Sequence, residues 1–330
     1  MRAQLYSRYG GPEVLELRLD QPTPVPSAHE VLVEVQASAV NPIDWKLRAG
    51  HLRYVIPLHL PFVPGRDFAG VVLECGRRAT GVAPGDRVFG LAPLRGPGSH
   101  CEQIAVSESL VALAPARLGM REAASLPLVG LTAIQAVDAA HVRRGERVLV
   151  QGGAGGVGSL AIQYARHLGA EVSATVGPRN LDYVRELGVV LAIDHANERF
   201  EDRIRELDVV IDCVGGEIEE RSFSVLRPGG RLISVAGSVR SDVDLGPAAI
   251  AGAAFRVPAR MLGQFFRGHR YRFVSARCDH DRLRRLAQLI DQAVLSPRID
   301  RCFALAELAD AHRRSEAGLA QGKIVLDHEI

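Results

Sequence analysis

Lysine is almost absent from this chain. Only Lys46 and Lys323 occur, and every other basic residue is an arginine, which we interpret as a bias of genome composition rather than as a guanidinium-lined binding surface. The formal net charge is only +2 over 330 residues. Such a small net charge argues against binding to polyanions, so neither nucleic acid nor an anionic membrane surface is expected as a partner.

Cysteine is scarce, and the five cysteines stand singly with no C-x-x-C pair. This pattern fits reduced thiols in a cytoplasmic protein, buried as small hydrophobic side chains. The first residues do not combine a charged start with an apolar stretch, so no secretory signal peptide is expected. No segment offers the about 20 consecutive apolar residues that span a bilayer. We therefore expect a cytoplasmic protein that does not enter membranes.

The character of the sequence changes near residue 118, and its length suggests roughly two domains. Before that point, residues 30–39 alternate as a half-buried strand does, and Gly, Pro and Asp punctuate further short strands, as in a small β-barrel. After it, nearly continuous apolar strands alternate with amphipathic helices, which indicates a parallel sheet covered on both faces. These elements are expected at 147–151, 156–168, 171–176, 180–187, 190–194, 198–206, 208–213, 217–226 and 230–236, with a sixth strand near 271–275.

The end of the chain adds two amphipathic helices, 281–294 and 306–316, and a last strand, 323–326. A β-rich start, a central α/β unit and extra terminal elements suggest that the tail completes the first domain. We predict one domain formed by residues 1–117 and 278–330, and a second formed by residues 118–277.

A glycine-rich turn stands between the first strand and the first helix of the α/β unit. There, an apolar strand runs directly into Gly153-x-Gly155-x-x-Gly158. The first glycine allows the tight turn, the second lets the backbone approach phosphates, and the third lets the helix pack on the strand. The amides and the positive end of the helix then favour an anion. The segment, with Gly156 and Val157 inside it, predicts a site for a dinucleotide pyrophosphate.

An acidic residue is missing where an NAD site usually carries one, at the end of the second strand. That position reads Ser173-Ala174-Thr175-Val176-Gly177, and Arg179 follows. The missing acid and the nearby guanidinium suit a 2′-phosphate, so we predict NADP(H), with Thr175 and Arg179 at its adenosine end. His195, after the third strand, is a second candidate for that phosphate. The alternatives are that Arg179 only flanks a helix and that His195 is structural.

Short motifs follow one another in a consistent order along nearly the whole chain. They are Asn41-Pro42-Ile43-Asp44-Trp45-Lys46, Pro64-Gly65-Arg66-Asp67-Phe68-Ala69-Gly70, Gly85-Asp86-Arg87-Val88, Gly130-Leu131-Thr132-Ala133, Ala154-Gly155-Gly156-Val157-Gly158, Asp212-Cys213-Val214-Gly215, Arg227-Pro228-Gly229-Gly230 and Gly322-Lys323-Ile324-Val325-Leu326. Together they resemble the medium-chain dehydrogenase/reductase superfamily, and most of all its zinc-independent quinone oxidoreductase (zeta-crystallin-like) branch. The resemblance implies an α/β protein with a GroES-like β-barrel domain and a central Rossmann doubly wound parallel sheet.

The residues at the zinc positions of the superfamily differ in this chain. Zinc members place a Cys where Asn41 stands, a His-Glu pair where Arg66-Asp67 stands, and another Cys where Leu128 aligns. Catalytic zinc needs about three converging N, S or O ligands, which Asn, Arg and Leu do not supply. The four-cysteine cluster of the structural zinc is also missing from the sequence. The sequence therefore predicts no metal.

Without zinc to stabilise an alkoxide, reduction of an activated acceptor is the expected chemistry. A quinone or another conjugated carbonyl accepts hydride directly, so the protein needs only to orient the reactants and supply a few hydrogen bonds. We predict an NADPH-dependent reductase of this type, which by resemblance is a homodimer. One alternative is reduction of the C=C bond of an enal, enone or enoyl thioester. An alternative of another class is a non-enzymatic NADPH-binding protein.

The resemblance also suggests which residues surround the nicotinamide and the adenine. It places Asn41, Thr132 and the Ala236-Gly237 backbone beside the nicotinamide, and Cys213 and Val214 against the adenine. Asn41 is expected either to hydrogen-bond the acceptor or the ribose, or to be a turn residue before Pro42.

Three further residues are candidates for proton transfer and charge stabilisation. Asp44 and Lys46 are expected either to relay a proton to the reduced product or to form a surface ion pair. Tyr54 is either a donor to an oxyanion or a loop aromatic residue. Lys323 is interpreted as structural, because the last strand is expected to close the barrel.

Overall fold

The computed structural model describes residues 1–236, 262–263 and 268–329, and it divides into two compact units. Unit 1 comprises Met1–Leu131 and Arg277–Ile330, and unit 2 comprises Thr132–Ala276. The first boundary lies later than the expected one at residue 117, because helix α2 (Met120–Ala124) packs against strands of unit 1.

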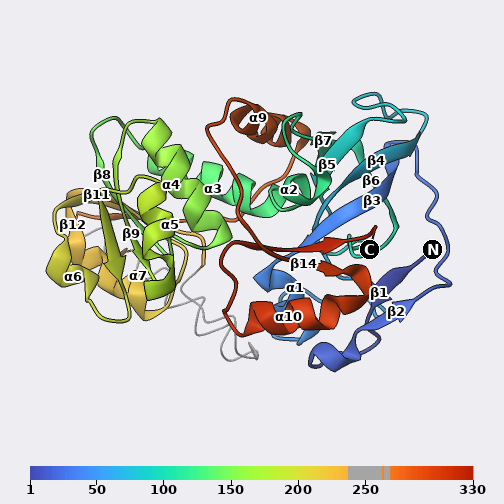
Figure 1. Ribbon diagram of the computed structural model, residues 1–330, viewed down its shortest axis with the longest axis horizontal. Coiled ribbons are helices and arrows are strands. Elements are labelled where there is room, and N and C mark those ends of the chain that lie inside the picture. The colour runs from blue at the N-terminus through green and yellow to red at the C-terminus, as the bar shows by residue number, and fades with distance from the viewer. Residues whose placement is uncertain (237–261, 264–267, 330) are drawn as a thin grey trace. The chain divides into compact units, whose positions relative to one another are not determined.

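Unit 1 is built on a seven-stranded sheet in the order β14-β15-β3-β4-β5-β7, with β6 paired to β3 (Figure 1). The last strand of the chain, β15, pairs antiparallel with β3, so that Ile324 lies opposite Val40. The tail therefore belongs to the same sheet as the first third of the chain. The strands of this unit are β1 (Ala3–Leu5), β2 (Glu16–Arg18), β3 (Glu30–Val40), β4 (Asp67–Cys75), β5 (Arg87–Leu91), β6 (Gln103–Ser107), β7 (Val111–Leu113), β14 (Ile299–Ala304) and β15 (Lys323–Asp327).

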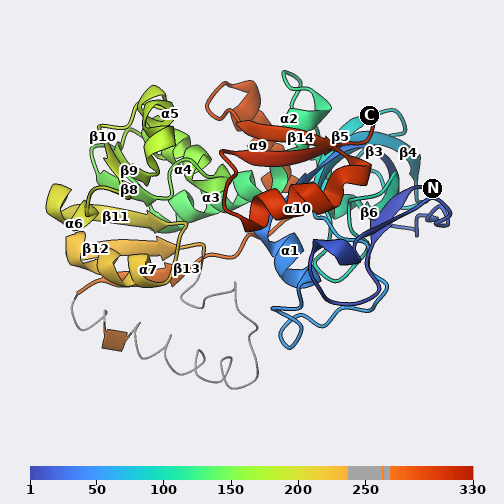
Figure 2. The ribbon, with the colours of Figure 1, turned by 60° about the horizontal axis from the view of Figure 1, so that its bottom comes forward.

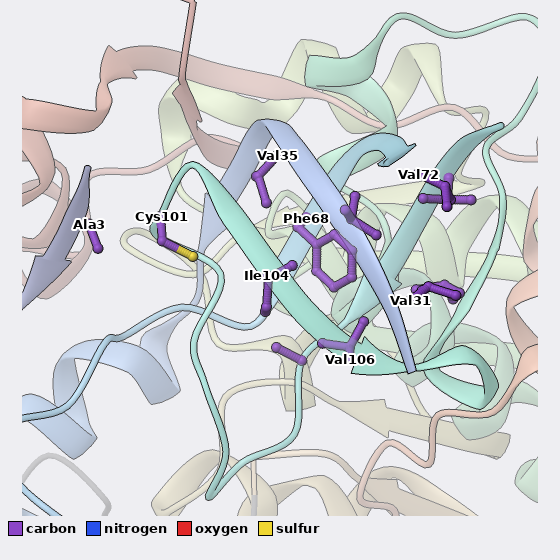
Figure 3. Packing of buried hydrophobic residues seen from close by; sticks show 12 residues of the cluster. Ala3, Val31, Val35, Phe68, Val72, Cys101, Ile104 and Val106 are labelled. Atoms are coloured by element: carbon purple, nitrogen blue, oxygen red, sulfur yellow. The ribbon is translucent and has the colours of Figure 1, made fainter. Parts of the chain in front are cut away.

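Alternation along β3 explains how this sheet forms its core. Val33 and Val35 are buried, whereas Glu34 between them is exposed, as the period of two in a strand requires. Figure 3 shows Phe68 packed among valine and isoleucine side chains of the neighbouring strands. The helical elements of unit 1 are η1 (Pro12–Val14), α1 (Pro42–Arg48), η2 (Glu108–Leu110), α2, α9 (His280–Asp291), η5 (Leu305–Glu307) and α10 (Leu308–Glu316).

Three buried histidines come together in unit 1. The Ser38 hydroxyl lies 2.9 Å from His100 Nδ1 and 2.9 Å from His328 Nε2. His312 Nδ1 lies 3.1 Å from the buried Arg48 guanidinium, and the rings of His100 and His312 are 6.4 Å apart. Burial lowers the pKa of His312 to about 3 and that of His328 to about 4, and it holds the pKa of His100 well below the usual value. All three are therefore neutral at physiological pH.

Unit 2 contains a six-stranded parallel sheet in the order β10-β9-β8-β11-β12-β13. The strand order reverses between β8 and β11, and ligands of open α/β sheets bind at the carboxyl ends of the strands beside such a reversal. The parallel sheet predicted from the apolar strands is confirmed. Its strands are β8 (Arg147–Gln151), β9 (Glu171–Val176), β10 (Leu191–Asp194), β11 (Leu207–Asp212), β12 (Leu226–Ser234) and β13 (Arg270–Phe273).

Helices cover both faces of this sheet. Figure 2 shows α4 (Gly156–His167) and α5 (Leu181–Glu186) on one side and α7 (Glu217–Ser222) on the other. The chain runs from β8 towards β10 in one direction along the sheet and from β11 towards β13 in the other. Because both sets of crossovers are right-handed, their helices lie on opposite faces. The remaining helical elements are α3 (Pro127–Ala140), which continues from unit 1 into unit 2, and η3 (Pro178–Asn180), α6 (Phe200–Arg203) and η4 (Phe223–Val225). Within the described ranges, none of the helices has the length and apolar character needed to cross a membrane.

Candidate functional site

The glycine-rich turn joins β8 to α4, as the sequence predicts. The Gly153 N–H donates to the Thr175 carbonyl at 2.9 Å, which fixes the turn to the next strand. Gly155 is the N-cap residue of α4, and no side chain caps the helix there. Since the first N–H groups of a helix have no intrahelical acceptor, this turn presents backbone donors that suit an anion.

Packing within the protein requires two of the three motif glycines but not the third. A Cβ at Gly158 would lie 2.3 Å from the Gly152 carbonyl oxygen, and a Cβ at Gly153 would lie 2.8 Å from the Ala174 Cβ, so both glycines are required by packing. A Cβ at Gly155 would meet only the Gly152 oxygen, at 3.5 Å, an ordinary contact. The surrounding residues therefore leave space for a Cβ at Gly155. The turn therefore fits a ligand that approaches the backbone at that position.

Thr175 lies underneath the turn. Its buried hydroxyl donates to Gln151 Oε1 at 2.6 Å and accepts from the Gly152 N–H at 3.2 Å. The Gln151 amide in turn donates to the Ser222 hydroxyl at 3.1 Å. The structure therefore makes Thr175 a support of the turn, together with Gln151 and Ser222, which the sequence reasoning missed. The sequence did offer a sign of this role, because Gln151 is a polar residue at the end of an otherwise apolar strand.

Arg179 and His195 lie at the carboxyl ends of neighbouring strands. Asp194, the last residue of β10, is the register partner of Val176, the last residue of β9. A Cβ at Gly177 would lie 3.7 Å from His195 Nε2, so the ring stands beside the loop that carries Arg179. Both side chains are exposed. The structure thus brings the two predicted phosphate ligands to the same edge of the sheet.

The other predicted cofactor residues of unit 2 lie on α3 and after β11 and β12. Cys213 is half-buried and Val214 is 52% exposed. The buried Asp212 carboxylate accepts from the N–H groups of Val214 and Gly215, which fixes this loop, and burial raises the Asp212 pKa. Thr132 on α3 is buried, and Ala236 follows β12. Gly237 lies outside the described residues.

In unit 1, a buried polar network joins residues that are far apart in the sequence. The Lys323 ammonium group donates to Asn41 Oδ1 at 2.6 Å, to Asp67 Oδ2 at 3.0 Å and to the Val40 carbonyl at 3.1 Å. The Asn41 amide donates to the same Asp67 oxygen at 3.0 Å. Both ends of the Asn41 amide are therefore engaged within the chain. Lys323, interpreted from the sequence as only structural, is the central residue of this network.

Asp67 of this network is one of the two residues, Arg66 and Asp67, that stand where the resemblance places the His-Glu pair of zinc members. The second oxygen of Asp67 accepts from the Leu128 N–H at 2.8 Å. In the part of the chain that the structure describes, no three His, Cys, Asp or Glu side chains are close enough to hold a metal ion together. The prediction of a zinc-free protein stays a prediction.

The Asp44 side chain lies against the backbone of Asn41 at the start of α1. Its carboxylate accepts from the Asn41 N–H at 2.7 Å, as part of the capping box of α1. The carboxyl group is buried, and burial raises its pKa to about 7. The Lys46 ammonium group lies 5.4 Å from the centre of the Trp45 ring. Asp44 is therefore not part of a surface ion pair, which was the alternative left open by the sequence.

Tyr54 lies at the surface of unit 1. The residue is 52% exposed, and its hydroxyl accepts from the Arg53 guanidinium at 3.2 Å. Asp44 instead borders a small pocket within unit 1 that has room for about one water molecule. The pocket is lined by Tyr6, Asp44, Leu47, Phe62, Pro64, Gly65, Arg66, Pro93 and Leu94. Tyr54 is not among the residues that line it.

Comparisons with known proteins agree with this geometry. Residues 27–130 match the family model described as "Alcohol dehydrogenase GroES-like domain", and residues 187–326 match the one described as "Zinc-binding dehydrogenase". The chain is 35% identical to a 2-methylene-furan-3-one reductase of Solanum lycopersicum, over 99% of this chain and 79% of that protein. It is 34% identical to an NADPH-dependent alkenal/one oxidoreductase, chloroplastic, of Arabidopsis thaliana, with the same coverage.

Among solved structures, the chain is similar to the quinone oxidoreductase from Coxiella burnetii. The TM-score is 0.85 at 34% sequence identity, and the match covers 99% of both chains. Together with the first family model, this match confirms the predicted GroES-like domain and parallel sheet.

Proposed function

Because the chain belongs to the medium-chain dehydrogenase/reductase superfamily, we propose that it is an NADPH-dependent reductase of quinones or other conjugated carbonyl compounds. The observation that carries the proposal is the glycine turn, where Gly155 leaves room for a phosphate that the protein itself does not fill. The activities named for the similar proteins support the same type of enzyme: a 2-methylene-furan-3-one reductase, an alkenal/one oxidoreductase and a quinone oxidoreductase.

Residues of unit 2 are proposed to hold the cofactor. The glycine turn holds the pyrophosphate, while Arg179 and His195 bind the 2′-phosphate. When bound, the nicotinamide supplies the hydride. Thr175 supports the turn from below. The residues proposed to contact the cofactor are Gly153, Gly155, Gly156, Val157 and Gly158 at the pyrophosphate, Cys213 and Val214 at the adenine, and Thr132, Ala236 and Gly237 at the nicotinamide.

Replacing Gly155 by alanine tests the pyrophosphate site. Since the new Cβ meets only an ordinary contact at 3.5 Å, the melting temperature should stay at the parent value. Close approach of a phosphate would be blocked, so we expect the Kd for NADPH to rise about tenfold or more, corresponding to about 1.4 kcal/mol. Fluorescence titration with NADPH measures the Kd of the parent and of the variant. Gly158→Ala is the contrasting variant, because its Cβ strikes backbone and should lower stability as well. Unchanged NADPH affinity in Gly155→Ala would exclude pyrophosphate binding at this turn.

Replacing Arg179 by alanine tests the choice of cofactor. A hydrogen bond to a charged group contributes about 1.5–3 kcal/mol, so NADPH should lose that much binding energy relative to NADH. The Michaelis constants for NADPH and NADH in parent and variant measure the change. Arg185→Ala serves as control, since Arg185 pairs with Asp182 on the exposed side of α5. A discrimination ratio that Arg179→Ala leaves at the parent value would contradict the assignment.

In unit 1, Asp44 is the proposed proton donor to the reduced product. With its pKa raised to about 7 by burial, the carboxyl group is poised to give up a proton near neutral pH. Asn41 is engaged at both ends of its amide, so we propose that it positions neighbouring groups rather than binding the acceptor directly. The role of Lys46 in a proton relay stays a prediction, and so does the role of Tyr54 as a hydrogen-bond donor to an oxyanion.

A panel of acceptors tests the proposed activity. NADPH oxidation is measured with a benzoquinone, an alkenal and an enoyl thioester, and we expect turnover with the first two classes. Turnover of the alkenal or the enoyl thioester without turnover of the benzoquinone would favour the C=C reductase alternative. Tight NADPH binding without turnover of any acceptor would favour a non-enzymatic NADPH-binding protein.

Zinc independence, dimer formation and a cytoplasmic location are separate proposals. One matching family model is described as zinc-binding, so metal analysis of active protein is the test, and stoichiometric zinc would contradict the proposal. We propose a homodimer formed through the sheet edge of unit 2; the segment after Gly237, from which the sequence analysis inferred that edge, lies outside the described residues. Sedimentation of a monomer alone would contradict it. The cytoplasmic location is testable by fractionation of the source cells.

A further inference from the structure

We propose that the small pocket of unit 1 is a binding site for one ordered water molecule, which joins the Tyr6 hydroxyl to the Asp44 carboxyl group. The site needs neither cofactor nor acceptor, so it goes beyond the proposed function. Only its importance for the reaction rests on that function, because Asp44 is the proposed proton donor.

The Tyr6 hydroxyl is a buried polar group in search of a partner. Tyr6 is completely buried, and its hydroxyl has no hydrogen-bond partner among the described residues. Buried polar groups are rarely left unpaired, and each unpaired one needs an explanation. Because Tyr6 lines the pocket, a molecule bound there supplies the missing partner.

Tyr6 and Asp44 are near one another without direct contact. Burial is the largest cause that raises the pKa of the Tyr6 phenol, and the charge of Asp44 is among the further causes. Yet no hydrogen bond joins the two side chains, although both line the same pocket. Polar groups that lie close together but beyond direct hydrogen-bond distance are commonly bridged by water. The pocket has room for about one such molecule.

The charges around the pocket favour a neutral occupant. The Arg66 guanidinium and the Asp44 carboxyl group both border it, so a cation meets the first and an anion meets the second. The remaining walls are apolar side chains and the Gly65 backbone. A buried water needs two to four polar partners. Tyr6, Asp44 and Arg66 supply three, and water is the neutral molecule of that size that both donates and accepts hydrogen bonds.

All three polar partners are held in place by the fold of unit 1. The Tyr6 N–H donates to the Phe62 carbonyl at 3.1 Å, and the Phe62 N–H donates back to the Tyr6 carbonyl at 3.0 Å. Asp44 belongs to the capping box of α1. Arg66 donates through its Nε to the Ala92 carbonyl at 3.1 Å. The site is therefore formed before the water arrives.

Several fixed groups already act on the Asp44 carboxyl group. Its pKa is raised to about 7, and burial is the largest cause. The hydrogen bond from the Asn41 N–H lowers the pKa, and the charge of Asp67 raises it. The cations of Lys323 and Arg66 lower it. None of these groups is altered by a change at Tyr6.

The bridging water adds to these effects. The Tyr6 phenol stays protonated near neutral pH, because its pKa is raised, so it donates to the water oxygen. Both O–H groups of the water remain available, and one donates to Asp44. A hydrogen bond donated to a carboxylate favours the charged form and lowers its pKa. The water therefore keeps the Asp44 pKa lower than burial alone would set it.

A crystal structure of the parent that resolves ordered waters tests the site directly. We expect one density peak within hydrogen-bond distance of both Tyr6 Oη and an Asp44 carboxyl oxygen. A pocket without density would overturn the proposal. Crystals soaked in bromide distinguish water from an anion, and an anomalous bromide peak in the pocket would also overturn it.

Tyr6→Phe tests the bridge in solution, because it removes one oxygen and keeps the ring. We expect the Asp44 pKa to rise by about one unit, a tenfold change in the acid dissociation constant, since the carboxylate loses its bridging donor. NMR titration of isotope-labelled aspartate measures the pKa, and Asp44→Asn identifies the signal. Tyr9→Phe is the matched control, because Tyr9 does not line the pocket. An Asp44 pKa that is equal in the parent and in Tyr6→Phe, or raised equally by Tyr9→Phe, contradicts the bridge.

Neither measurement uses NADPH or an acceptor, so the water site and the proposed function fail separately. A protein with the water in place that reduces no acceptor keeps the site and loses the function. An active reductase whose pocket shows no density keeps the function and loses the site. Should Tyr6→Phe not fold, the density in the parent decides the question.

Discussion

Replacing Lys323 by methionine should lower the free energy of unfolding by about 3–5 kcal/mol, because it leaves a buried carboxylate without its countercharge. Asp67 is fully buried, and the Lys323 ammonium group is 3.0 Å from its Oδ2. The same ammonium group satisfies Asn41 Oδ1. Urea denaturation of parent and variant measures the loss.

The double variant Lys323→Met, Asp67→Asn is the control for this interpretation. It removes the negative charge together with the positive one, so it should be more stable than Lys323→Met alone. If the single variant lies within 1 kcal/mol of the parent, or if the double variant is the less stable of the two, the ion pair is not the source of stability.

Acidification from pH 6.5 to pH 5 should destabilise the protein by about 3 kcal/mol. The pKa values of His100, His312 and His328 are lowered by burial, so the unfolded chain takes up protons in this range that the folded chain does not. Each histidine then lowers the free energy of unfolding by about 1.7 kcal/mol over the interval, or about 5 kcal/mol for the three together. Asp44 acts in the opposite direction, because its raised pKa, about 7, keeps its proton in the folded state, which offsets about 2 kcal/mol.

Urea denaturation at a series of pH values checks this slope. His312→Gln is the informative variant, because glutamine can still accept from Arg48 but cannot take up a proton. We expect the dependence of unfolding free energy on pH to become shallower in that variant. A free energy that is constant between pH 5 and 6.5 in the parent would show that the histidines are not buried as neutral groups.

Local patterns in the sequence predicted most of unit 2, because each strand and helix there is made by neighbouring residues. The predicted strands 147–151 and 171–176 coincide with β8 and β9. The helix predicted over 198–206 is much shorter, at Phe200–Arg203. Ile204 is extended and Glu206 has a φ of 58°, a left-handed conformation that ends a helix. The pattern of apolar residues does not reveal such backbone conformations, so it could not predict where this helix ends.

The residues of the candidate site fall into two groups: those found from a local sequence pattern and those brought together by contacts between distant parts of the chain. The glycine turn, with the missing acid and Arg179 that follow it, is a local pattern, and the sequence predicted its place. The contact between Asn41 and Lys323 joins residues 282 positions apart, and Tyr6 reaches its pocket through a pairing with Phe62. Such contacts depend on strand register across the whole of unit 1. A single sequence does not specify that register.

The place of β15 between β14 and β3 has a consequence for synthesis on the ribosome. Unit 2 is continuous in the chain, so all of its strands have emerged from the exit tunnel while the sheet of unit 1 still lacks its final members. The nascent chain therefore keeps the β15-pairing edge of β3 uncovered until β15 has emerged, and until then Asp67 lacks its ion-pair partner Lys323. Chaperones that shield exposed strand edges should accordingly engage the amino-terminal third of the nascent polypeptide.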